Sequence, residues 1–135
     1  MSFLENIKIN ITRTEFVVSF VIFLILDVIF IYLNRNNFIN IITKIQGKEP
    51  KMDIPSAIIT YFFLYLGLFY FILNQKKSVF DAFILGIVIY GVFEFTTRTV
   101  FKDWTLYTAV IDTIWGGVLF ASTTYFTKII STRIS

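Results

Sequence analysis

The sequence contains no cysteine and no histidine. Their absence excludes disulfide bonds, thiolate nucleophiles, zinc or haem sites built on imidazole, and Ser-His-Asp hydrolysis. Charge is also sparse: the net charge is +3, the sequence pI is about 9.2, and the basic residues form no stripe and accompany no stacking motif. Nucleic-acid binding therefore has no support, and we predict no cofactor, no metal ligand and no catalytic residue.

Apolar side chains are present in excess. Of the 135 residues, 56% are hydrophobic and 19% aromatic, including 17 Phe and 7 Tyr, and the mean hydropathy is +0.75. A water-soluble domain of this size must keep a polar surface, and so many aromatic rings would overfill its core. Lipid tolerates apolar side chains that face outward, so the composition predicts one integral, multi-pass membrane domain with the bilayer as its main partner.

Four apolar runs occur at even spacing along the chain. A helix rises about 1.5 Å per residue and the hydrocarbon layer is roughly 30 Å thick, so a run of this length can cross the membrane once. We predict an all-α, integral membrane four-helix bundle over residues 16–131, preceded by an N-terminal arm at 1–15 and followed by a tail at 132–135. The predicted spans are 16–33, 54–73, 79–97 and 106–126.

The longest connection, residues 34–53, has an apolar face of its own. Phe38, Ile41, Ile42 and Ile45 share one side of a helix at 3.6 residues per turn. This spacing predicts a short interfacial helix between the first and second spans, lying on the membrane, with an apolar loop as the alternative.

Helix-start signals accompany the second and third spans. Pro55 falls in the first turn of the second span, where a missing N–H costs nothing. Ser78 followed by Asp81 resembles a capping box, so we interpret Asp81 as a cap rather than a catalyst. Trp104, in the loop before the fourth span, falls at the depth where indole rings collect.

The distribution of basic residues does not decide the orientation, because each side of the predicted bundle carries the same number. The Lys76-Lys77 pair in the shortest loop favours both termini in the cytosol. The sequon Asn10-Ile-Thr12 would then stay unglycosylated, and sugar on Asn10 would invert the topology.

Besides the cap residue Asp81, three acidic residues lie deeper inside the predicted spans, although an Asp at a helix centre costs roughly 2.5–3.5 kcal/mol on insertion scales. Asp27 lies six residues before the end of the first span, Glu94 three residues before the end of the third, and Asp112 six residues after the start of the fourth. Both ends and that start face the same membrane surface. All three acids are therefore expected about 5–9 Å below it, in one polar layer.

Other polar residues are predicted to complete this layer. Arg98 follows Glu94 by four positions, the favourable order for an ion pair along one helix. Three carboxylates with one guanidinium leave a negative excess, so either an acid is protonated or a cation completes the site. The predicted ligand- or ion-binding residues are Asp27, Glu94, Arg98, Asp112, Trp115, Tyr90, Thr97 and Tyr61, and Tyr65 is a further possible phenol donor.

Two purely structural interpretations stand beside the binding site. Buried polar groups also fasten helices to one another, and shallow acids can extend into water. Gly116-Gly117 and the four-residue step from Ala82 to Gly86 are typical of close helix packing.

The third and fourth spans carry three recognisable motifs: YGVFEFTT at 90–97, KDW at 102–104 and IDTIWGG at 111–117. Together with FLILD at 23–27, they resemble the small membrane proteins grouped as domain of unknown function 2177, over roughly residues 20–130. The resemblance implies a four-helix inner bundle with a shared polar site, and it implies no biochemical activity. The family usually has Asp in place of Glu94 and Asn in place of Thr97, which puts in doubt any role that needs an amide at Thr97.

Three functions compete at this point. The first is a transporter or channel component that binds a proton, a cation or a small cationic ligand, with Arg98 as counter-charge, and this function would be expected to require a homodimer. The second is a structural or assembly subunit of a larger membrane complex. The third, a membrane enzyme acting on lipid or isoprenoid, is the weakest because the sequence has no D-D-x-x-D-like cluster and no nucleophile with a base.

Overall fold

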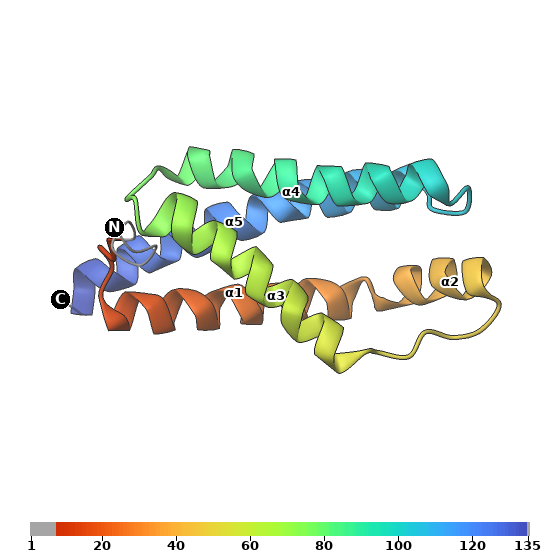
Figure 1. Ribbon diagram of the computed structural model, residues 1–135, viewed down its shortest axis with the longest axis horizontal. Coiled ribbons are helices and arrows are strands. Elements are labelled where there is room, and N and C mark those ends of the chain that lie inside the picture. The colour runs from red at the N-terminus through yellow and green to blue at the C-terminus, as the bar shows by residue number, and fades with distance from the viewer. Residues whose placement is uncertain (1–7, 135) are drawn as a thin grey trace, which may run out of the picture.

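The computed structural model describes residues 8–134, and within them the chain forms helices and no strand. Four of these helices are long and apolar enough to cross a membrane, which confirms the all-α, four-span fold. The elements are α1 (Arg13–Leu33), α2 (Arg35–Gln46), α3 (Ile54–Leu68) continued by a π-helical turn η2 (Phe69–Leu73), α4 (Val79–Val100) and α5 (Leu106–Ile134) (Figure 1).

The helix starts agree closely with the sequence signals, whereas α4 ends three residues beyond its predicted span and α5 ends eight residues beyond its own, within the predicted tail. Ser78 Oγ accepts a hydrogen bond from the Asp81 amide at 3.0 Å, so the predicted cap of α4 is confirmed. Pro55 lies in the first turn of α3, also as predicted. Helix α1 begins at Arg13, three residues earlier than predicted, because Thr12 caps it through the Glu15 amide. Residues 1–7 of the predicted arm lie outside the described part of the chain.

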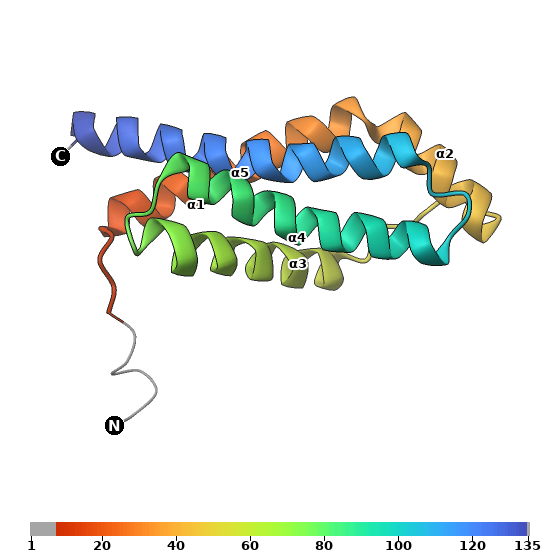
Figure 2. The same cartoon turned by 90° about the horizontal axis from the view of Figure 1, so that it is seen from above.

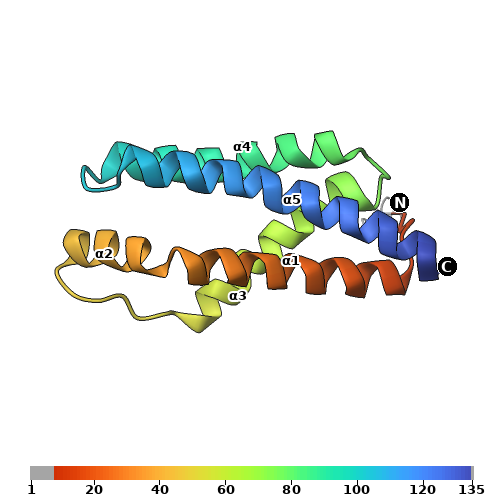
Figure 3. The ribbon, with the colours of Figure 1, turned by 180° about the vertical axis from the view of Figure 1, so that it is seen from behind.

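The short helix between the first and second spans is confirmed as α2. It follows α1 after a break at Asn34 and runs on in roughly the same direction (Figures 1 and 3). Its predicted apolar face is turned toward the end of the α4–α5 hairpin, where Ile41 is buried with Trp104 and Ala109. Asn37 Nδ2 adds a hydrogen bond to Thr108 Oγ1 of α5 at 2.9 Å. Protein side chains therefore cover much of this face.

The bundle is uneven. Helices α4 and α5 pack against each other along their length (Figure 2), and α1 packs against α5. Helix α3 approaches its neighbours only sparsely. Helix α3 crosses the bundle at an angle (Figure 1). The start of α1 and the end of α5 lie at the same end of the bundle, as four crossings require.

Helices α4 and α5 approach closely because glycines replace side chains in their interface. A Cβ atom at Gly86 would collide with the carbonyl oxygen of Gly116, and one at Gly116 would collide with the ring of Tyr90. A Cβ at Gly117 would lie 2.7 Å from a ring carbon of Phe83. Small residues allow helix backbones to approach closely in lipid, where dispersion contacts replace the hydrophobic effect. The predicted close packing at these positions is confirmed.

We predict that Gly86→Ala destabilises the bundle by about 1–3 kcal/mol, because the added methyl group meets backbone rather than a movable side chain. The matched control is Gly67→Ala on α3, where the new Cβ would lie 3.6 Å from Ile89 Cδ1, an ordinary contact. The control should match or exceed the wild-type stability, since Ala favours a helix over Gly by about 1 kcal/mol. Thermal unfolding in detergent, followed by circular dichroism, measures both changes. Equal stability of the two variants would contradict the close approach.

Candidate functional site

Asp27 of α1 is held by two neutral donors from two other helices. The hydroxyl of Tyr61 on α3 donates to Asp27 Oδ2 at 2.5 Å, and the indole N–H of Trp115 on α5 donates to Oδ1 at 2.9 Å. Only 5% of Asp27 is exposed, and the Trp115 ring stacks on Phe30 with 4.6 Å between ring centroids. This carboxyl group therefore joins three helices, and no Lys or Arg between residues 8 and 134 forms an ion pair with it.

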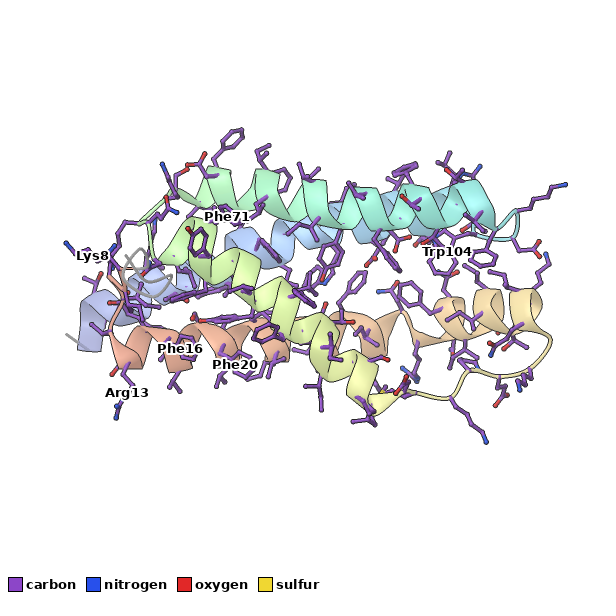
Figure 4. The ribbon with its side chains drawn as sticks, viewed as in Figure 1. Lys8, Arg13, Phe16, Phe20, Phe71 and Trp104 are labelled. Carbon is purple, nitrogen blue, oxygen red and sulfur yellow. The ribbon has the colours of Figure 1, made fainter. Side chains whose placement is uncertain are left out.

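Glu94 of α4 is bonded to a residue that the sequence did not assign to the site. Its Oε2 accepts the indole N–H of Trp104 at 2.6 Å, and only 1% of the residue is exposed. Trp104 belongs to the α4–α5 loop (Figure 4), and its ring contacts Phe38 of α2. A buried indole needs an acceptor for its N–H. This requirement could have indicated from the sequence that Trp104 of the KDW motif bonds to a nearby acid.

The predicted ion pair between Glu94 and Arg98 is not formed. The Arg98 guanidinium is directed to the backbone carbonyl of Trp104, to which it donates at 2.8 Å. The ion pairs of the described residues are Lys44–Asp103 and Lys76–Glu15. A pair spaced by four on an open helix face contributes only about 0.2–0.5 kcal/mol, less than a typical net hydrogen bond between buried groups, so the loop contacts prevail.

Asp112 of α5 lies across the helix interface from Glu94. The two carboxyl groups are close enough to interact directly, and Asp112 also lies within electrostatic range of Asp27. Glu94 Oε1 is buried and has no hydrogen-bond partner within the described residues. The fields of all three acids reach the Tyr90 hydroxyl. The three acids therefore form one electrostatic group.

A pocket of about 560 Å³ opens beside these acids, between α3 on one side and α1, α4 and α5 on the other. Its polar lining comes from Asp27, Asp112, Tyr61, Tyr90 and Thr60. The remaining lining is apolar: Phe30, Ile31, Phe38, Ala57, Phe63, Leu64, Ile89 and Phe93.

The predicted site residues thus separate into three groups. Asp27, Asp112, Tyr61 and Tyr90 line the pocket, while Glu94 and Trp115 contact or hold its carboxyl groups. Thr97 and Arg98 do not join them. The Thr97 hydroxyl donates to the Phe93 carbonyl of its own helix at 2.7 Å, and Arg98 is exposed.

Tyr65, the second phenol expected near the acids, is bonded elsewhere. Its hydroxyl contacts Ser19 Oγ and the carbonyl of Phe16, one turn farther along α3 than Tyr61 and toward the opposite end of α1. The same two helices are therefore joined twice, once by Tyr61 with Asp27 and once by Tyr65 with Ser19. Among the residues that the structure describes, no group of three acids is compact enough to hold a metal ion.

A family model described as predicted membrane protein (DUF2177) matches residues 12–129, which include all but the ends of the four-span bundle. No curated protein and no solved structure matches the chain. The matched segment contains every site residue described above, and it confirms the resemblance expected from the motifs of the third and fourth spans. The chain belongs to the DUF2177 family of predicted membrane proteins.

Proposed function

We propose that this integral membrane protein binds a proton or a small cation at the carboxyl groups of Asp27, Glu94 and Asp112. The supporting observation is that Asp27 and Asp112 line one pocket, Asp112 interacts with Glu94, and no described ion pair neutralises the three acids. Ionisable side chains within membrane spans usually belong to proton or ion sites.

The Glu94–Asp112 pair supports proton binding. Two neighbouring carboxyl groups in a poorly solvated site cannot both stay ionised at low cost, so one proton shared between them is the favourable state. A cation that approaches the pair can take the place of that proton. Proton release on cation binding is the expected signature.

Asp27 supports the same function in a different way. Its two hydrogen-bond donors, Tyr61 and Trp115, are neutral and stabilise a carboxylate without cancelling its charge. An acid held in this manner still attracts a cation from the pocket that it lines.

A structural role is the second candidate, and the same bonds favour it. The Asp27 carboxyl joins α1, α3 and α5, and the Glu94–Trp104 bond fixes the α4–α5 loop to α4. Such bonds contribute about 0.6 kcal/mol each on average in membrane bundles. A subunit of a larger membrane complex would need these bonds and no exchangeable ligand.

Movement of the bound cation across the membrane is a further part of this proposal, and it needs a second copy of the chain. Four helices offer few surfaces that can rearrange around a site, so a homo-oligomer would supply the missing ones. The Lys76-Lys77 pair in the α3–α4 connection still favours cytosolic termini, which would direct the site to the opposite face.

We predict that Asp112→Asn leaves the protein folded but abolishes proton release when a monovalent cation is added. Asn preserves the size of the side chain and cannot exchange a proton with Glu94. Proton release is measured with a pH indicator in lightly buffered detergent solution, with methylammonium as the added cation and Asp81→Asn, at the cap of α4, as the control. If Asp112→Asn fails to fold and the wild-type protein releases no proton, the structural role is correct instead.

We also predict that Tyr61→Phe lowers the free energy of unfolding by about 0.6–1.7 kcal/mol, because it leaves one oxygen of Asp27 without its donor. The control is Tyr70→Phe on the same span, where the side chain is 39% exposed and the change should stay within about 0.5 kcal/mol. Thermal unfolding in detergent compares the two. Equal effects would show that the Tyr61–Asp27 bond does not join α1 to α3.

A further inference from the structure

The pocket beside the acids has a polar floor and an apolar rim. Asp27 and Tyr90 are only 5% and 9% exposed, so they form the buried end of the pocket. Phe63 of α3 and Phe93 of α4 also line it, and they are 63% and 60% exposed. The rim therefore faces the lipid that surrounds the bundle, and a ligand that enters between α3 and α4 crosses apolar side chains first.

The sparse packing of α3 explains why this opening exists. Helix α3 leans across the bundle while α4 stays against α5 (Figures 1 and 2). The volume of about 560 Å³ lies within the range of roughly 300–1,000 Å³ that is usual for pockets that bind small organic molecules. A single inorganic ion would fill little of this space.

The lining carries charge of one sign. Asp27 and Asp112 contribute carboxyl groups, and no Lys or Arg of the described chain lines the pocket. Six of the lining residues are aromatic: Phe30, Phe38, Tyr61, Phe63, Tyr90 and Phe93. Aromatic faces attract organic cations, by about 0.5–2 kcal/mol per contact, and tolerate their apolar groups. A hydrated metal ion would gain nothing from these walls and would lose its water.

We propose that the pocket binds a lipophilic organic cation, of the quaternary ammonium or phosphonium class, which enters from the membrane between α3 and α4. The charge lies beside Asp27 and Asp112, and the apolar groups lie against the aromatic walls. This proposal rests on the cation binding proposed above, and it adds the class of ligand and the route of entry. The acyl chain of a bilayer lipid is the competing occupant, and it would be indifferent to the acids.

The test uses the full chain in zwitterionic lipid nanodiscs with two probes of nearly the same shape and opposite charge. Tetraphenylphosphonium should bind saturably, and tetraphenylborate should not exceed its partition into empty nanodiscs. Equilibrium dialysis measures both. Asp27→Asn should weaken phosphonium binding by about tenfold or more, because it removes the charge partner at the floor. Asp112→Asn, whose folding is checked by gel filtration and circular dichroism, should do the same.

A second variant tests whether phosphonium binding needs the volume of the pocket, with both carboxyl groups kept. Ala57→Leu adds bulk to the pocket wall on α3, so it should weaken phosphonium binding by about tenfold. The control is Ala121→Leu on α5, which is equally half-buried but does not line the pocket, and it should bind as the wild type does.

The outcomes separate the two proposals. Equal binding of both probes, unaffected by Asp27→Asn, would identify the pocket as a site for lipid chains and overturn the inference. Proton release with methylammonium but no saturable phosphonium binding would also overturn it, while the proposed proton or cation site would stand. Charge-selective binding that Ala57→Leu and Asp27→Asn both weaken would support the inference and the site together.

Discussion

The close approach of α4 and α5 at Gly86, Gly116 and Gly117 is the constraint on which the rest of the molecule depends. The two helices are antiparallel: Gly116 lies one turn after Asp112 on α5, and Gly86 lies two turns before Glu94 on α4. The buried residues of α4 continue from Gly86 in four-residue steps through Tyr90 to Glu94. Because the backbones are this close at the glycines, the carboxyl groups farther along the same interface are brought within reach of each other.

Tyr90 connects the packing with the site. Its ring occupies the space that a side chain at Gly116 would need, and its hydroxyl lies within range of all three acids. Any widening of the α4–α5 interface would thus also move the polar group that faces the pocket. A change that loosens the α4–α5 hairpin would therefore also change the geometry around the acids.

Neutral donors, rather than cations, accommodate the acids. Tyr61 and Trp115 hold Asp27, Trp104 holds Glu94, and Arg98 is bonded to a backbone carbonyl in the loop. This arrangement lowers the cost of burying Asp27 and Glu94 without placing a described cation beside either of them. A fully neutralised ion-pair network would have served as a fastener and little else.

Hydropathy and local helix-start signals by themselves determined the four spans, the cap at Ser78 and the place of Pro55 in the first turn of α3, because these features follow from the order of residues along one helix. The spacing also predicted that Asp27, Glu94 and Asp112 lie near one another, and Asp27 and Asp112 line one pocket. The tertiary structure alone decided which donors meet the acids. Local spacing favoured the Glu94–Arg98 pair, but the folded loop brought a buried indole to Glu94 instead. Only the tertiary structure could also show the pocket, since the angle at which α3 crosses its neighbours depends on side-chain packing between helices and leaves no periodic signal in the sequence.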